Sequence, residues 1–211
     1  MYQRGAGPTS FTIGRMRPSS LSSSAIVALL LLGGPLPAAA PPAAEAGAAP
    51  GPASAAPTAA AVLQKARAAA GKRNVFVAFH ASWCIWCKAL EKLTLLPGTK
   101  PVFDRYYTVA WLTVDERTSR KSLENAGADE VRTRLGGDGV ALPFYGVVDL
   151  EGKVLATSAR RGLDGKKENV GFPAAPDEVE DFLAIFRAGA PDLTESEEKA
   201  LVDGIASLAK R

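Results

Sequence analysis

Cys84 and Cys87 are the only cysteines in the chain, and they carry its clearest chemical signal. They stand between the apolar run Val75–Phe79, which is typical of a buried strand, and a segment with helical spacing. At the start of a helix, unpaired backbone N–H groups and the aligned peptide dipoles favour an anion. We therefore predict that Cys84 is stabilised as a thiolate, the nucleophilic form, with Lys88 adding positive charge nearby. We expect Cys84 to be exposed at the helix start. Cys87, one turn further on and shielded by its own helix, is placed to attack a mixed disulfide formed on Cys84.

The same two cysteines are open to other interpretations. A Cys-x-x-Cys pair can be half of a metal site or chemically inert, and His80 beside it could help to bind copper or haem iron. Covalent haem attachment is excluded because Lys88, and not a histidine, follows Cys87. A copper-binding chaperone using the same cysteines is the alternative function. The apolar Ile85-Trp86 dipeptide and the absence of Met-rich segments count against it.

Strands that alternate with helices must position these cysteines. The pattern of apolar residues, caps and glycines predicts an α/β fold with a mixed central sheet, helices on both faces and an extra C-terminal helix. Capping-box pairs are expected at Asp177/Glu180 and at Thr194/Glu197. The predicted helices cover 59–70, 84–96 and 119–135, followed by two that begin at the capping boxes, and the predicted strands cover 75–79, 108–114, 140–148 and 153–157.

The segment Trp83-Cys-Ile-Trp-Cys-Lys88 resembles the active-site signature of the thioredoxin superfamily. Its surroundings are similar to exported bacterial thioredoxin-like proteins, including the periplasmic C-terminal domain of the membrane disulfide reductase. The resemblance covers approximately Val62 to Arg187. It implies a thioredoxin fold, a redox-active disulfide between Cys84 and Cys87, and the activity of a thiol-disulfide oxidoreductase.

The resemblance also implies which residues meet the substrate. Leu142-Pro143-Phe144 matches the family's cis-proline loop, which faces the cysteines, so Pro143 is expected to be cis and Leu142 to offer backbone groups to a substrate strand. The full set of expected substrate-binding residues is Trp83, Ile85, Trp86, Leu142 and Pro143.

The chain departs from the family pattern at positions that handle protons. Many thioredoxins carry a buried Asp six positions before the first cysteine, where this chain has Ala78. Trp111 is the expected occupant of the position where a buried Lys is common. Glu91, one turn past Cys87, could replace that pair but is expected to face solvent. The bulky Ile85-Trp86 dipeptide also leaves the redox potential open, within a range of roughly −270 to −120 mV.

The first sixty residues do not have the pattern of folded protein. A positive start around Met16, a short apolar run over Ala25–Leu32 and small residues after it are the three parts of a secretory signal, with cleavage after Ala40 or Ala46. The run is too short to span a bilayer comfortably. We expect an exported protein, periplasmic or secreted. The predicted organisation is an extension and signal peptide at 1–46, an Ala/Pro-rich tether at 47–60, a thioredoxin-like domain at 61–190 and a C-terminal helix at 191–211.

Composition limits the partners. Formal net charge is +3 from 25 Lys and Arg against 22 Asp and Glu, which does not suggest nucleic acid. The basic pairs Arg160-Arg161 and Lys166-Lys167 are expected to lie in a solvated loop. The expected partners are protein thiols and disulfides together with a redox partner protein. We expect a monomer with no cofactor, no metal, and no stable membrane insertion after signal cleavage.

Overall fold

The computed structural model describes residues 56–162 and 165–210, so the predicted signal peptide and most of the predicted tether lie outside the described residues. In chain order the elements are α1 (Ala59–Ala70), β1 (Asn74–His80), α2 (Ile85–Leu95), α3 (Lys100–Tyr106), β2 (Tyr107–Thr113), the 3-10 helix η1 (Thr118–Leu123), α4 (Ala128–Arg134), β3 (Phe144–Val148), β4 (Val154–Thr157), β5 (Ala159–Arg161), β6 (Lys167–Asn169), α5 (Pro176–Ala188) and α6 (Glu195–Ala209).

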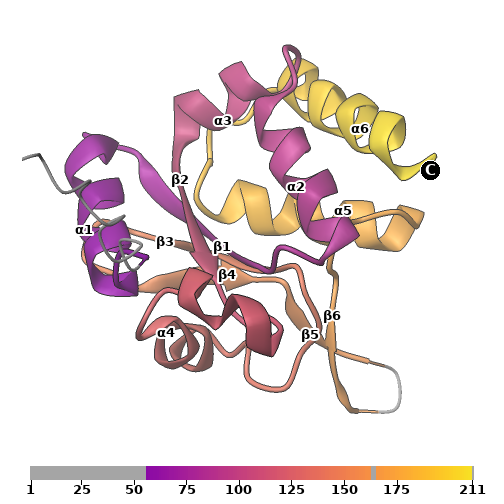
Figure 1. Ribbon diagram of the computed structural model, residues 1–211. Helices are drawn as coiled ribbons and strands as arrows, with labels where there is room; N and C mark the ends of the chain where they lie inside the picture. Colours follow the sequence, from indigo (N-terminus) through magenta and orange to yellow (C-terminus); the bar gives the residue numbers. More distant parts are fainter. Residues whose placement is uncertain (1–55, 163–164, 211) are drawn as a thin grey trace, which may run out of the picture. The chain divides into compact units, whose positions relative to one another are not determined.

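The main sheet has its strands in the order β2-β1-β3-β4 (Figure 1). β1 pairs with β2 in parallel and with β3 antiparallel, and β4 pairs antiparallel with β3. The predicted mixed sheet is thus confirmed. Ala78 on β1 lies directly opposite Trp111 on β2, so the two positions at which the resemblance implied a proton-handling pair are neighbours here.

Side chains of β1 alternate between two apolar cores, one on each face of the sheet, as period-2 geometry requires. Phe76 and Ala78 face the core built with α2, α3, α5 and α6. Val75, Val77 and Phe79 face the core built with α1 and α4. Helices therefore cover both faces, as predicted, and the strand leading to the cysteines is buried on both sides (Figure 1).

The predicted single helix over 119–135 is wrong. The chain forms η1, then a turn, and then α4. Gly127 has φ of 83°, a left-handed conformation that interrupts a helix and that glycine adopts at little cost. The Asn125 side chain accepts a hydrogen bond from the N–H of Thr113 and donates one to the carbonyl of Pro57, which fixes the turn against β2.

Two further expectations need correction. The capping box at Asp177/Glu180 is wrong, because α5 begins earlier, at Pro176, and Glu178 accepts hydrogen bonds from the N–H groups of Ala174 and Ala175. The basic pairs expected in a solvated loop lie instead in and beside the β5–β6 hairpin. Arg160 there forms ion pairs with Asp177, Asp181 and Glu168. Helix α3 was not predicted at all.

The extra C-terminal helix is confirmed as α6, and its capping box is confirmed as well. Thr194 Oγ1 accepts a hydrogen bond from the N–H of Glu197, whose carboxylate accepts one from the N–H of Thr194. α6 packs closely on the back of α2, since a Cβ at Gly204 would lie 3.0 Å from Leu93 Cδ1. In the part of the chain that the structure describes, no helix is long and apolar enough to cross a membrane.

Candidate active site

The two cysteines form a disulfide at the point where β1 passes into α2. Cys84 is the N-cap of α2, and its Sγ accepts a hydrogen bond from the backbone N–H of Cys87 at 3.1 Å. The sulfur atoms are 2.06 Å apart, and the Cα atoms are 5.2 Å apart. The predicted disulfide and its place at the helix start are therefore observed. A thiolate on Cys84 would accept the same N–H hydrogen bond that the sulfur accepts here.

Cys84 is more enclosed than we expected. The expectation was an exposed Cys84 and a shielded Cys87, whereas the two residues are 5% and 1% exposed. Leu142 contributes to this burial, because it packs against the cluster formed by Ala81 and both cysteines. An attacking sulfur must therefore approach Cys84 beside Leu142.

A groove of about 540 Å³ opens at Cys84 and is lined mainly by apolar side chains: Trp83, Ile85, Trp86, Ala89 and Leu142. Trp83 and Trp86 are each 44% exposed and Ile85 is 70% exposed. Large apolar side chains that remain in water beside a reactive group are typical of a surface that meets a partner. The structure thus brings together Trp83, Ile85, Trp86 and Leu142 of the predicted substrate-binding set, and their binding role remains a prediction.

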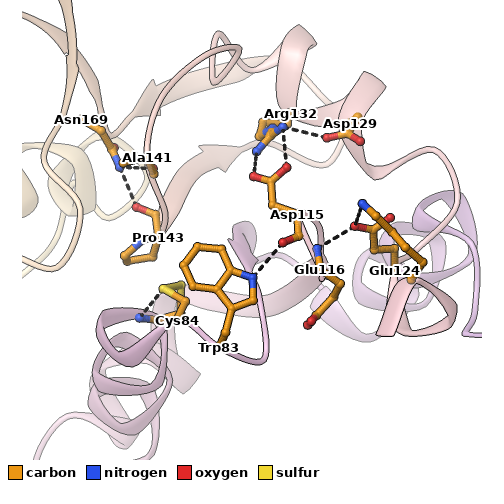
Figure 2. A network of polar contacts seen from close by, with 12 residues as sticks. Trp83, Cys84, Asp115, Glu116, Glu124, Asp129, Arg132, Ala141, Pro143 and Asn169 are labelled. Carbon is orange, nitrogen blue, oxygen red and sulfur yellow. Dashed lines mark hydrogen bonds and ion pairs between the residues drawn. A yellow bond between two sulfur atoms is a disulfide. The ribbon is translucent and has the colours of Figure 1, made fainter. Parts of the chain in front are cut away.

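The loop before β3 contributes Leu142 to the lining of this groove. The Leu142–Pro143 peptide bond is cis, as the resemblance implied, and Pro143 is buried. The amide of Asn169, at the end of β6, donates hydrogen bonds to the carbonyls of Ala141 at 2.7 Å and Pro143 at 2.8 Å. Figure 2 shows this amide directed at the loop. Asn169 was not identified from the sequence.

The loop after β2 supports the other side of the site (Figure 2). Trp83 Nε1 donates a hydrogen bond to the carbonyl of Asp115 at 2.8 Å. Asp115 has φ of 53°, the one positive value among non-glycine residues of the described chain. Its carboxylate forms an ion pair with Arg132, which also pairs with Asp129. Arg132 of α4 therefore fixes Asp115, whose carbonyl accepts the hydrogen bond from the Trp83 indole.

Glu116 is a buried carboxylate beside the cysteines that sequence reasoning missed. It is 4% exposed, and its two oxygens accept hydrogen bonds from the N–H and the hydroxyl of Ser82, two positions before Cys84. Its own N–H donates to the carboxylate of Glu124. Parallel pairing of β1 with β2 brings the carboxyl ends of both strands to one edge, so the loops after them meet. Prediction of β1 and β2 as parallel neighbours would therefore have placed Glu116 near Ser82.

His80 ends β1 on the face covered by α2. Its Nε2 lies 3.1 Å from Thr113 Oγ1, and its ring centre lies 5.2 Å from that of Trp111. Burial lowers the pKa of His80, against the opposing charges of Glu91 and Glu116. Within residues 56–162 and 165–210, no three or more His, Cys, Asp or Glu side chains are grouped so that they could hold a metal ion.

Three features agree with the thioredoxin fold that the resemblance implied: the strand order β2-β1-β3-β4, the Cys84–Cys87 disulfide at the start of the helix after β1, and the cis-proline loop before β3. No protein-family model matches the chain, and no curated protein matches it.

Among solved structures, the chain is similar to a disulphide isomerase from Xylella fastidiosa Temecula1, with 17% identity, a TM-score of 0.40, and coverage of 72% of this chain and 92% of that one. It is also similar to DsbH oxidoreductase, with 15% identity, a TM-score of 0.38, and coverage of 71% and 96%. A thiol:disulfide interchange protein from Bacteroides sp. matches with 20% identity, a TM-score of 0.31, and coverage of 60% and 81%. Because the identities and TM-scores of these three structures are low, the fold assignment rests on the strand order and on the geometry of the disulfide and the cis-proline loop.

Proposed function

We propose that the chain is a thiol-disulfide oxidoreductase that exchanges or reduces disulfides in exported proteins. The observation that carries this proposal is the Cys84–Cys87 disulfide, which caps α2 and opens into an apolar groove. A structural disulfide that closes so short a loop would constrain the unfolded chain little, because the entropic effect grows with loop length. A pair of this kind at a helix start is better suited to redox chemistry.

The reaction balances without a bound cofactor. In the reduced protein, the Cys84 thiolate attacks one sulfur of a substrate disulfide, and the other substrate sulfur leaves as a thiolate. The Cys87 thiolate then attacks Cys84 Sγ, which releases the second substrate sulfur and forms the Cys84–Cys87 disulfide. Two electrons pass to the substrate. The two protons released when Cys84 and Cys87 ionise balance the two that the substrate thiolates take up. A dithiol partner protein must then reduce the Cys84–Cys87 disulfide before the next turnover, and it is itself oxidised to a disulfide.

The apolar groove supports protein substrates. Trp83, Ile85 and Trp86 offer wide apolar contact around Cys84, and a polypeptide segment beside a half-cystine could cover that surface. Export is proposed on the sequence of residues 1–46 alone. If the chain is exported, protein isolated from its host should begin downstream of about residue 40. Cytosolic protein with an intact N-terminus would contradict export without affecting the redox proposal.

Trapping of the mixed disulfide tests the function. Cys87→Ser keeps the attacking thiol and removes the resolving one, so partner proteins should accumulate as reducible adducts on Cys84 when the variant is expressed in an oxidising compartment. Cys84→Ser is the matched control and should trap little. The measurement is a non-reducing gel of both variants, with insulin reduction by the wild type assayed in parallel.

The alternative function predicts another outcome. In a copper chaperone, both cysteine variants should lose Cu(I) binding about equally, and neither should collect disulfide-linked partners. If both variants lack adducts and the wild type does not reduce model disulfides, the oxidoreductase proposal is refuted and a binding role is favoured.

A further inference from the structure

The short segment Asn169–Phe172 contacts both sides of the groove at Cys84. At one end, the Asn169 amide donates hydrogen bonds to the carbonyls of Ala141 and Pro143. At the other, the Phe172 ring stacks on Trp86, with ring centres 5.7 Å apart and an angle of 14° between the planes. Gly171 lies between them with φ of 63°, a backbone conformation that bends the chain and suits glycine.

The rest of the fold holds this segment in place. The N–H of Val170 donates to the carbonyl of Ser158, and Ser158 in turn exchanges hydrogen bonds with the backbone of Tyr145 on β3. Val170 and Phe172 are 4% and 6% exposed. Asn169 is therefore presented from a fixed backbone and not from a free loop.

The orientation of the Asn169 amide follows from its partners. Both groups that face it are carbonyl oxygens, which only accept hydrogen bonds, so Nδ2 must point toward them. Asn169 Oδ1 is buried and has no hydrogen-bond partner among the described residues. A buried acceptor without a partner costs free energy. The two hydrogen bonds that Nδ2 donates must therefore offset the free-energy cost of the unpartnered Oδ1.

These two hydrogen bonds occupy the carbonyls on either side of Leu142. In the part of the chain that the structure describes, neither the N–H nor the carbonyl of Leu142 has a hydrogen-bond partner. The Leu142 side chain packs on the disulfide and lines the groove. An extended polypeptide could pair with its peptide groups, whereas a small disulfide without peptide groups could not.

We propose that Asn169 is a positioning residue that fixes the Ala141–Pro143 loop so that the Leu142 peptide groups receive the backbone of a polypeptide substrate. This rests on the proposed function and adds a distinction among substrates. Asn169 serves polypeptide disulfides and is dispensable for small ones, because it acts on the docking loop and not on the sulfur atoms.

The test compares two substrates with the reduced, full-length protein. Asn169→Ala removes both hydrogen bonds. Asn169→Asp keeps the shape but places a carboxylate, which has no N–H to donate, against two carbonyl oxygens. The matched control is Asn74→Ala, which removes an amide-to-carbonyl hydrogen bond of 2.8 Å to Gly189 from the start of β1, at the other end of the strand from the disulfide.

Both Asn169 variants should raise KM for insulin about tenfold, the order expected when two hydrogen bonds between neutral groups are lost. Their rates with cystamine, a small disulfide without peptide groups, and the redox potential of the cysteine pair should match the wild type, as should every value for Asn74→Ala. Unchanged rates with cystamine also report that the variants are folded.

Two results would overturn the inference while the proposed function stands. One is an unchanged KM for insulin in both Asn169 variants. The other is an equal loss with insulin and cystamine together with a changed potential, which would mean that Asn169 supports the whole site. A wild type that reduces neither substrate would instead refute the proposed function itself.

Discussion

Glu197 ties α6 to α3, and its removal should have an effect that depends on pH. The carboxylate accepts hydrogen bonds from the N–H and hydroxyl of Thr194, from the hydroxyl of Tyr106 at 3.0 Å and from Arg105 at 2.8 Å. Partial burial by itself raises the pKa of Glu197, but the hydrogen bonds from Thr194, Tyr106 and Arg105 outweigh it and lower the pKa from 4.5 to about 2.

The contribution of Glu197 to the free energy of unfolding follows from the difference between its pKa in the unfolded and in the folded chain. At about 1.36 kcal/mol per pKa unit, a change of about 2.5 corresponds to roughly 3.4 kcal/mol of folding stability. Solvent screening around a side chain that is 17% exposed reduces this to about 2 kcal/mol. Because the folded-state pKa is the lower one, the stabilisation is complete above the unfolded value near 4.5. It is lost as the pH falls toward 2, with about 60% of it gone by pH 3.

Glu197→Gln should therefore lower the free energy of unfolding by about 2 kcal/mol at pH 7 and by about 1 kcal/mol at pH 3. The assay is urea unfolding followed by tryptophan fluorescence at both pH values, with wild type and variant measured side by side so that other carboxyl groups cancel. Glu195→Gln is the control, because it removes an exposed carboxylate from the same first turn of α6. An equal loss at pH 7 and pH 3 would refute the electrostatic reasoning and leave only a shape effect.

Three other changes test the site and its support. Cys84 should titrate below about 8.5, the value of a free thiol, and should be alkylated faster than Cys87 at neutral pH; faster alkylation of Cys87 would reverse the assigned roles. Gly204→Ala should destabilise the protein in urea by about 1–3 kcal/mol, because the new Cβ would lie 2.6 Å from Thr99 Cγ2; a net gain would show that helix propensity, worth about 1 kcal/mol, outweighs the clash. Glu116→Ala should cost about 1–3 kcal/mol, since it leaves the N–H and hydroxyl of Ser82 without their partner; unchanged stability would mean that water replaces the carboxylate freely.

The sequence was informative where a single physical signal dominates a segment. A continuous apolar run predicted β1, and the Thr194/Glu197 box predicted the start of α6. Both signals are local, so they can be recognised without knowledge of the fold. The helix α2 was predicted over 84–96 and begins one residue later, because Cys84 acts as its cap.

The parts that were missed depend on distant partners. β5 and β6 are each three residues long and rich in charge, so they show no apolar alternation. Ion pairs from Arg160 to Asp177 and Asp181 on α5 hold them. Asn169 likewise gains its role only because the hairpin returns it to the Ala141–Pro143 loop. No local pattern distinguishes such a residue from an ordinary polar loop residue.

The surroundings of the disulfide indicate what must stabilise a thiolate on Cys84. Ala78 and Trp111 are neighbours on β1 and β2, at the positions where the resemblance implied ionisable groups, and neither side chain can exchange a proton. Of the nearby acids, Asp115 is paired with Arg132, and Glu116 is bonded to Ser82. The stabilisation that we predict would then come from backbone N–H groups at the start of α2, above all that of Cys87, together with the positive charge of Lys88.

Backbone N–H groups do not titrate, so their stabilisation of a Cys84 thiolate does not depend on the protonation of a neighbouring side chain. α2 is held from behind by α6, whose Gly204 allows the close approach to Leu93 and Thr99. Because Cys84 caps α2, a shift of α2 would carry both cysteines with it and change their packing against Leu142, and with it the burial that influences the thiol pKa. The added C-terminal helix is thereby connected to the chemistry. Gly204→Ala should accordingly alter the redox potential of the cysteine pair as well as stability, although it lies outside the groove. A potential equal to that of the wild type, measured on a destabilised variant, would separate the two effects and assign α6 to stability alone.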